Sequence, residues 1–281
     1  MECGKIYLVP TPIGNLKDMT LRGLEVLNFV DIVAAEDTRQ SLKLLNHFEI
    51  KKPLISYHQH NEQGKSEDIL EMAREGKNIA IVTDAGTPGV SDPGAVIVQK
   101  CIENNIGFEV LPGATAFTTA LVYSGLDTTK FLFRGFISRE TKERKILLDE
   151  IRNSKESLIF YESPHRLVST LNLLLTELGN RKIAVCRELT KLHEEIKRGT
   201  LEEVIEYFSQ KSIKGEFVLV VEGKQQEQID KENKEKWEEL SIEDHIILLI
   251  NEGLSKKEAI KKVAKDRGLQ KNVVYQVATE I

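Results

Sequence analysis

The sequence predicts an α/β fold with two domains, built on parallel and mixed sheets, followed by a small helical module. Three observations predict it. Short apolar runs rich in Val and Ile alternate with stretches of helical spacing over the first part of the chain. A second alternating segment follows, in which two neighbouring strands have no helix between them. Beyond a charged segment, the end of the 281-residue sequence reads as three short helices.

Four continuous apolar runs in the first segment are typical of strands buried on both faces of a parallel sheet. They span residues 5–9, 31–35, 78–82 and 108–111. Helical spacing predicts helices over 21–29, 40–47, 62–74 and 95–103. Thr20 could cap the first helix, and Ser66 or Asn61 the third. In such a sheet we expect a ligand at the carboxyl ends of the strands.

The second segment predicts strands over 131–136, 157–162, 182–189, 194–200 and 215–223, with helices over 140–152, 165–178 and 201–210. The strands near 185 and 196 adjoin directly, which favours antiparallel pairing. We therefore expect an N-terminal α/β domain over 1–122 and a second over 123–224. A charged, solvated linker over 225–239 and a helical module over 240–281 complete the prediction.

Composition excludes several classes of protein. The longest apolar run, "FVDIVAA", is broken by Asp31 and falls far short of the ~18 residues of a membrane span. The three cysteines are scattered, which suggests neither a zinc site nor a disulfide framework. A reduced, cytoplasmic compartment fits best. The net charge of −5 argues against a surface that attracts nucleic acid as a whole.

The last residues are nevertheless basic. From 253 to 281 the sequence has seven Lys or Arg residues, at 256, 257, 261, 262, 265, 267 and 271, against acids at 258, 266 and 280. The turn at Gly268 and the helix after it resemble helix-turn-helix spacing. Two interpretations stay open, a small bundle with solvated lysines and a surface that faces nucleic acid.

The loop "VTDAGTPGVSDPG", residues 82–94, follows a predicted strand. Phosphate-binding loops use consecutive backbone N–H groups and avoid anions. Here Pro88 and Pro93 remove donors, and Asp84 and Asp92 would repel a phosphate. The loop suits a ligand with hydroxyls and a positive centre, such as an adenosyl sulfonium, or a sugar. Alternatively, its aspartates only cap turns and the helix that begins at Gly94.

Other motifs flank predicted strands. "TPIGN" (11–15) could be an ordinary tight turn, and "LPGATA" (111–116) could pack closely or let a ligand touch backbone. "AAEDTR" (34–39) is either a salt-bridged cap or a polar site facing the same cleft. "YESPHR" (161–166) and "CRELTKLHEE" (186–195) hold basic residues that would suit nucleic-acid phosphates or pair with nearby acids: Arg166, Arg187 and Lys191.

Together, "VPTPIGNLKDMTLRGLEVL", "AAEDTR", "VTDAGTPGVSDPG", "PGATA", "FYESPHRL" and "CRELTKLHEE" resemble the 2′-O-ribose methyltransferases of small-subunit ribosomal RNA, within the tetrapyrrole-methylase superfamily. The resemblance runs from about Lys5 to Gly223. It implies two α/β domains with an S-adenosylmethionine cleft between them, and a homodimer. The implied reaction is methyl transfer to the ribose 2′-hydroxyl of a cytidine in the decoding region of 16S rRNA, within the assembled small subunit.

The resemblance also implies where the cofactor binds, and no metal is expected. One group of residues should line the methionine and ribose side: Asp84, Ala85, Gly86 and Val90, with Thr115 and Ala116 beside them. A second group should approach the adenine: Tyr161, Phe217 and Val218. Pro12 would close the floor of the pocket.

The reaction must activate a hydroxyl that is protonated at neutral pH. A positioned base adds about 10²–10⁴-fold, and a neighbouring cation lowers the pKa of the hydroxyl. The candidates at the cleft are Glu36, Asp37, Asp92, Glu188 and Lys191. We favour Glu188 with Lys191, a base beside a cation at one strand end. Replacing Glu188 by Gln should slow methyl transfer and leave cofactor affinity intact.

The basic tail and the arm at 133–145 are the expected RNA-facing surfaces. Two rival functions are a tetrapyrrole or translation-factor methyltransferase of the same superfamily, and a non-catalytic ribosome-binding factor. The long Asp-rich loop and basic tail disfavour the first, since a small substrate needs neither. The second predicts no binding of S-adenosylmethionine.

Overall fold

The computed structural model describes residues 3–279, although for residues 230, 232, 233 and 236 it describes only the backbone. The chain divides into two compact units. Unit 1 comprises residues up to 151 and residues 156–222, and it contains both β-sheets. Unit 2 comprises 152–155 and the residues from 223 onward, and it is helical. None of the helices in the described part combines the length and apolar character needed to cross a membrane.

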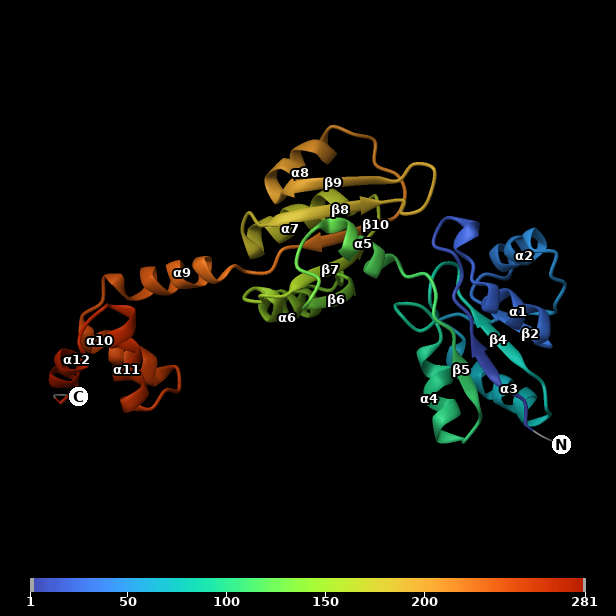
Figure 1. The fold of residues 1–281 in the computed structure, drawn as a ribbon, viewed down its shortest axis with the longest axis horizontal. Helices are drawn as coiled ribbons and strands as arrows, with labels where there is room; N and C mark the ends of the chain where they lie inside the picture. Colours follow the sequence, from blue (N-terminus) through green and yellow to red (C-terminus); the bar gives the residue numbers. More distant parts are fainter. Residues whose placement is uncertain (1–2, 280–281) are drawn as a thin grey trace. The chain divides into compact units, whose positions relative to one another are not determined.

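The first sheet has the strand order β3-β2-β4-β1-β5, and every neighbouring pair is parallel. Figure 1 draws it in blue to green. Its strands are β1 (Ile6–Leu8), β2 (Ile32–Ala35), β3 (Leu54–Ser56), β4 (Ile79–Val82) and β5 (Phe108–Val110). The helices that follow them are α1 (Leu21–Phe29), α2 (Thr38–His47), α3 (Glu62–Arg74) and α4 (Ala95–Glu103), with a short 3-10 turn at Leu16–Asp18.

Helices cover both faces of this sheet. Side chains of α3 and α4 pack with Ile79 and Ile81 in one core cluster. Side chains of α1 and α2 pack with Ala80 and Val82 in another. Successive β4 residues thus face opposite clusters and all are buried, which explains why the strands are continuously apolar.

The second sheet has the order β6-β7-β10-β8-β9. Its strands are β6 (Phe131–Phe136), β7 (Ser157–Glu162), β8 (Lys182–Arg187), β9 (Glu195–Thr200) and β10 (Phe217–Val221). β6 and β7 are parallel, and the other neighbours are antiparallel. The predicted pairing near 185 and 196 is confirmed, because Val185 lies opposite Lys197.

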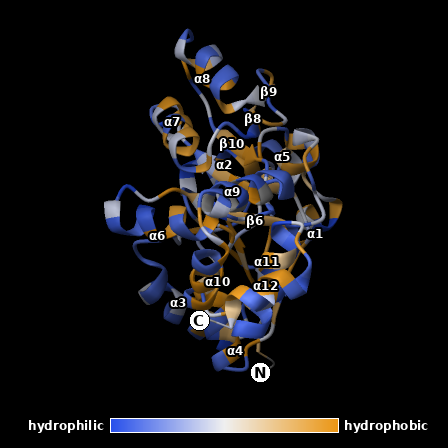
Figure 2. Ribbon diagram, turned by 90° about the vertical axis from the view of Figure 1, so that its left-hand side faces the viewer, coloured by the Kyte–Doolittle hydropathy of each residue, from blue (hydrophilic) through white to orange (hydrophobic). Residues whose placement is uncertain are grey.

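Helices α6 (Thr141–Ile151), α7 (Leu167–Leu178) and α8 (Leu201–Ser209) pack on one face of the second sheet, and α5 (Ala116–Ser124) on the other. Figure 2 shows α7 and α8 with hydrophobic and hydrophilic stretches alternating along each ribbon. The domain boundary expected at 122/123 falls inside α5, whose Ala120 and Leu121 are buried with strands of the second sheet. The boundary itself stays a prediction.

Unit 2 contains α9 (Gln226–Glu238), α10 (Ile242–Asn251), α11 (Lys256–Asp266) and α12 (Lys271–Ala278). The last three are the predicted short helices, and they share one small core. Ser241 and Ser255 cap α10 and α11. Helix α9 occupies the segment expected as a solvated linker, which is therefore regular structure.

Local details correct or refine other expectations. Thr20 caps α1 as predicted, accepting from the N–H of Gly23. Asn61 precedes α3 but makes no side-chain cap bond to it, and Ser66 instead contacts the Tyr57 hydroxyl inside the core. Strand β3, with only three residues after Pro53, was not predicted.

Candidate active site

The largest group of predicted site residues lines a cavity of about 430 Å³ in unit 1. From the first sheet, its walls come from the loops that follow β1, β2, β4 and β5. From the second sheet, they come from the ends of β7 and β8 and the start of β10. Because β10 runs antiparallel to both neighbours, its first residues lie at the same edge as their last residues. The cavity thus lies at the carboxyl edge where a ligand is expected.

Eleven of the twelve predicted residues line this cavity: Asp84, Ala85, Gly86, Val90, Thr115, Ala116, Tyr161, Glu188, Lys191, Phe217 and Val218. Pro12 does not line it. It lines a neighbouring cavity of about 420 Å³ that shares five residues with the first: Ile13, Asp84, Ala85, Lys191 and Glu216. The roles of all twelve residues stay predictions.

The loop from Asp84 to Gly94 is folded by backbone contacts. Thr11 and Gly86 exchange two hydrogen bonds of 2.9 and 3.0 Å, which hold the loop against "TPIGN". Gly94 has φ +140°, and a Cβ there would lie 2.8 Å from the nitrogen of Gly89. Gly94 also begins α4 without a side-chain cap. The interpretation of Asp92 as a helix cap is therefore wrong, since Asp92 lines the cavity instead.

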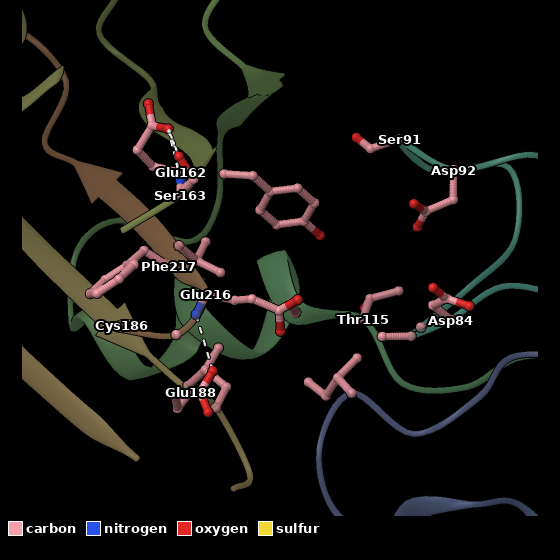
Figure 3. Close-up of a pocket in the computed structure, with 18 of the residues that line it drawn as sticks. Asp84, Ser91, Asp92, Thr115, Glu162, Ser163, Cys186, Glu188, Glu216 and Phe217 are labelled. Atoms are coloured by element: carbon pink, nitrogen blue, oxygen red, sulfur yellow. Dashed lines mark hydrogen bonds between the residues drawn. The ribbon is translucent and has the colours of Figure 1, made fainter. Parts of the chain in front are cut away.

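Most of the charged residues in the cavity wall are acids. Figure 3 shows Asp84 and Asp92 on one side of the cavity and Glu216 reaching toward it from the other. Six acids line it: Glu36, Asp84, Asp92, Glu162, Glu188 and Glu216. Among the described lining residues, Lys191 is the only cationic one. This wall favours a ligand that carries positive charge and hydroxyl donors, and it disfavours a phosphate.

Burial raises the pKa values of three of these acids. The pKa of Asp92 rises to about 7, chiefly through desolvation and further through the charges of Glu36, Asp84 and Glu216. Desolvation also raises the pKa values of Glu36 and Asp84. Asp92 therefore changes charge near neutral pH, unlike an ordinary aspartate.

Glu188 and Lys191 form an ion pair, as their spacing suggested. Lys191 Nζ lies 3.0 Å from Glu188 Oε1 and 2.7 Å from Glu216 Oε2, and the Glu216 N–H donates to Glu188 Oε1 at 3.0 Å. Burial opposes the charge on both groups, but these bonds outweigh it. They lower the pKa of Glu188 and raise that of Lys191. Both groups are thus ionised at neutral pH.

Two glycines make room for this pair. A Cβ on Gly215, which has φ +98°, would lie 2.6 Å from Glu188 Cγ. A Cβ on Gly14 would lie 2.4 Å from Lys191 Cγ. The glycine of "TPIGN" therefore serves close packing against the turn that carries Lys191. Glu188 itself has a left-handed backbone, with φ 50°.

The remaining motifs divide between structure and site. Glu36 lines the cavity, whereas Asp37 caps α2 and pairs with Arg39 at 2.7 Å. Gly113 of "LPGATA" lies against the Pro10 ring, so it serves packing, while Thr115 and Ala116 line the cavity.

The arginines considered for phosphates bind protein groups instead. Arg166 donates to the carbonyl of Ile137 at 2.6 Å, and Arg187 pairs with Glu195 at 3.2 Å. Sequence reasoning missed Glu216, which directly precedes the predicted residues Phe217 and Val218. The feature of the sequence that could have indicated Glu216 is an acidic residue beside Gly215, directly before an apolar strand.

A comparison with protein-family models gives the class of protein to which this fold belongs. The model described as Tetrapyrrole (Corrin/Porphyrin) Methylases matches residues 5–205. The fold is that of two solved enzymes. Diphthine synthase has a TM-score of 0.62 at 16% identity, covering 79% of this chain and 90% of that one. Uroporphyrin-III-C-methyltransferase from Thermus thermophilus has 0.58 at 22%, covering 78% and 94%.

Curated relatives narrow the class to one family. The protein named ribosomal RNA small subunit methyltransferase I is 49% identical over 274 residues in Bacillus subtilis, covering 98% of this chain and 94% of the relative. The Thermotoga maritima protein of the same name is 44% identical over 222 residues, covering 79% of this chain and all of the relative. This chain belongs to the ribosomal RNA small subunit methyltransferase I family, and it is a methyltransferase.

Proposed function

We propose that this protein transfers a methyl group from S-adenosylmethionine to the ribose 2′-hydroxyl of a cytidine in the decoding region of 16S rRNA, within the small ribosomal subunit. Two observations support the proposal: the acid-lined cavity, whose wall comes from both sheets, and the membership of this chain in the ribosomal RNA small subunit methyltransferase I family. The proposal includes a homodimer, as the family resemblance implies. It also places the protein in the cytoplasm, since small ribosomal subunits are found there.

The cavity wall fits S-adenosylmethionine in charge. When bound, this donor supplies a methyl group activated by a sulfonium. The donor's two positive groups match carboxylates such as Asp84 and Glu36, and its hydroxyls match the same acceptors. Phe217, Val218 and Tyr161 offer an apolar surface for the adenine. The scarcity of cations argues against a nucleoside triphosphate at this site.

Asp92 is the base that we propose for the 2′-hydroxyl. A carboxylate with a pKa of about 7 is both available and sufficiently basic at neutral pH. Glu188, the base favoured from sequence, has a lowered pKa and accepts two hydrogen bonds, so it is the weaker proton acceptor. In this proposal Lys191 supplies positive charge beside the developing alkoxide, and Glu188 holds Lys191 in position.

Radiolabelled methyl transfer tests the function. Unmethylated small subunits, naked 16S rRNA and a tetrapyrrole are offered in parallel, and calorimetry measures binding of S-adenosylmethionine. We expect binding, with methyl transfer to the subunits. Transfer to the tetrapyrrole alone would assign the chain to the small-molecule branch of the superfamily. No binding of the donor would overturn the proposal.

A further inference from the structure

Unit 2 contains a groove of about 690 Å³ between α11 and α12. Its lining residues are Lys256, Lys257, Ile260, Lys261, Lys271, Asn272, Tyr275, Ala278 and Thr279. Four lysines and no acid are among them. The exposed aromatic ring is that of Tyr275, which is 62% exposed.

The basic residues of the tail differ in their contacts and in whether they line the groove. Arg267 is occupied inside unit 2, where it donates to the carbonyls of Leu240 and Trp237 and to His245 Nδ1. Lys262 and Lys265 lie on α11 but do not line the groove. Among the side chains that the structure describes, none forms an ion pair with the four groove lysines.

The two described acids of the tail have partners other than the groove lysines. Glu258 accepts from the Ser255 N–H at 3.0 Å in the capping box of α11. Asp266 lies 4.0 Å from His245. The third acid of the tail, Glu280, lies outside the described residues. The groove is thus a concentration of positive charge in a protein whose net charge is −5.

Tyr275 indicates the form of the partner. An exposed ring beside lysines can stack on a base only where that base is free of its own neighbours. The single Trp does not provide such a surface, because its ring stacks on His245 at 5.0 Å. Lysines facing phosphates and a tyrosine facing a base together match unpaired nucleotides better than a duplex.

We propose that this groove binds unpaired nucleotides of ribosomal RNA, with its lysines on the phosphates and Tyr275 stacked on a base. The inference rests on the proposed function for the identity of the RNA. Because the groove lies in unit 2 and the acid-lined cavity in unit 1, the groove in this proposal contributes affinity for the RNA rather than chemistry.

Fluorescence anisotropy of the full chain with a labelled single-stranded oligoribonucleotide tests the proposal. Tyr275→Ala should weaken binding about five-fold or more, and Tyr275→Phe should retain it. The double variant Lys257→Gln/Lys261→Gln should reduce the slope of log affinity against log salt by about 1.4. Its matched control, Lys262→Gln/Lys265→Gln, removes the same charge from the same helix and should leave the slope unchanged.

Three results would overturn the proposal. They are equal binding by the Tyr275→Ala and Tyr275→Phe variants, equal salt slopes for the two double lysine variants, and tighter binding to a competing probe than to the single strand. The competing probes are a labelled duplex that contains the same oligoribonucleotide and a labelled acidic peptide. Circular dichroism confirms that each variant is folded. Donor affinity and methyl transfer at saturating subunits should be unchanged in the groove variants. Failure of the wild-type chain to methylate RNA would instead overturn the proposed function, because oligoribonucleotide binding is measured without catalysis.

Discussion

At the scale of single residues, Asp92 determines the expected pH dependence. Below its pKa of about 7 the carboxyl is protonated and accepts no proton. The single-turnover rate should therefore rise with pH and level off, with a midpoint at or below 7 because a bound sulfonium favours the carboxylate. Asp92→Asn should lower the plateau by about 10²–10⁴-fold and remove this rise. An unchanged rate and profile would exclude Asp92 as the base.

Glu188→Gln is the companion variant. Glutamine retains an acceptor for the Lys191 ammonium and the Glu216 N–H but loses the charge. We expect a smaller loss of rate than for Asp92→Asn, the same pH midpoint, and unchanged donor affinity by calorimetry. If Glu188→Gln lost as much rate and also lost the pH dependence, Glu188 would be the base and Asp92 a bystander.

Asp92 also affects stability, with a defined sign. Its pKa is raised in the folded state, so the unfolded chain releases this proton first as pH rises. Stability contributed by this group is complete below about pH 4 and is lost as pH rises toward 7. Asp92→Asn should therefore raise the melting temperature at about pH 8 relative to wild type, and hardly change it at acidic pH. A lower melting temperature at pH 8 would contradict the pKa.

Residue identity alone predicted much of the cavity wall but not the behaviour of Asp92. The motif showed an aspartate in a ligand-facing loop. Its raised pKa arises chiefly from burial and further from the charges of Glu36, Asp84 and Glu216, and both the burial and the approach of Glu36 and Glu216, which are distant in sequence, require the folded chain. The lowered pKa of Glu188 likewise depends on the Lys191 ammonium and on the backbone N–H of Glu216, the residue directly before β10.

At the scale of elements, the turn after β5 depends on a close backbone approach. A Cβ on Gly113 would lie 2.4 Å from the Pro10 ring, whereas one on Gly107 would lie 3.7 Å from Lys5. Gly113→Ala should cost about 1–3 kcal/mol by overpacking, visible in chemical denaturation, and Gly107→Ala should cost much less. Equal stability of the two variants would show that the turn can shift at no cost.

The elements were predictable where apolar periodicity was long and unmixed. Strands β2 and β4 are continuous runs of Val, Ile and Ala, β1 reads Ile-Tyr-Leu, and α3 was predicted with its observed bounds. Strand β3 has three residues, none fully buried, which is too little signal. Helix α9 was not predicted because charged residues dominate its sequence and it has no apolar periodicity. Pairs such as Lys231–Glu235 and Lys234–Glu238 nevertheless have the spacing that supports an exposed helix.

At the scale of the whole molecule, the cavity and the basic groove belong to different units. Every residue that lines the cavity lies between 13 and 218, within unit 1. Truncation after residue 236 keeps the contacts of Lys224 and Gln226 with 153–155. We expect unchanged donor affinity by calorimetry, weaker binding to small subunits, and a shallower salt dependence. Loss of donor binding would show that the units are interdependent.

The architecture followed from two rules. Alternating strands and helices imply a parallel sheet, and such a sheet places its ligand site at the strand carboxyl ends. The part of the cavity wall that comes from the second sheet could not be predicted without the register of β10. Only its antiparallel pairing, with Phe217 opposite both Glu162 and Arg187, brings Glu216 to that edge.

The acid-rich wall has a consequence for turnover. Under the proposed reaction, the departing sulfur is neutral, so the spent donor lacks the sulfonium charge that the carboxylates attract. The cavity should therefore bind S-adenosylmethionine more tightly than S-adenosylhomocysteine, and this difference in affinity should grow as Asp92 ionises. Calorimetry with S-adenosylmethionine and S-adenosylhomocysteine should give a larger affinity ratio at about pH 8 than at about pH 6. The same carboxylates would thus limit product inhibition, without any moving part.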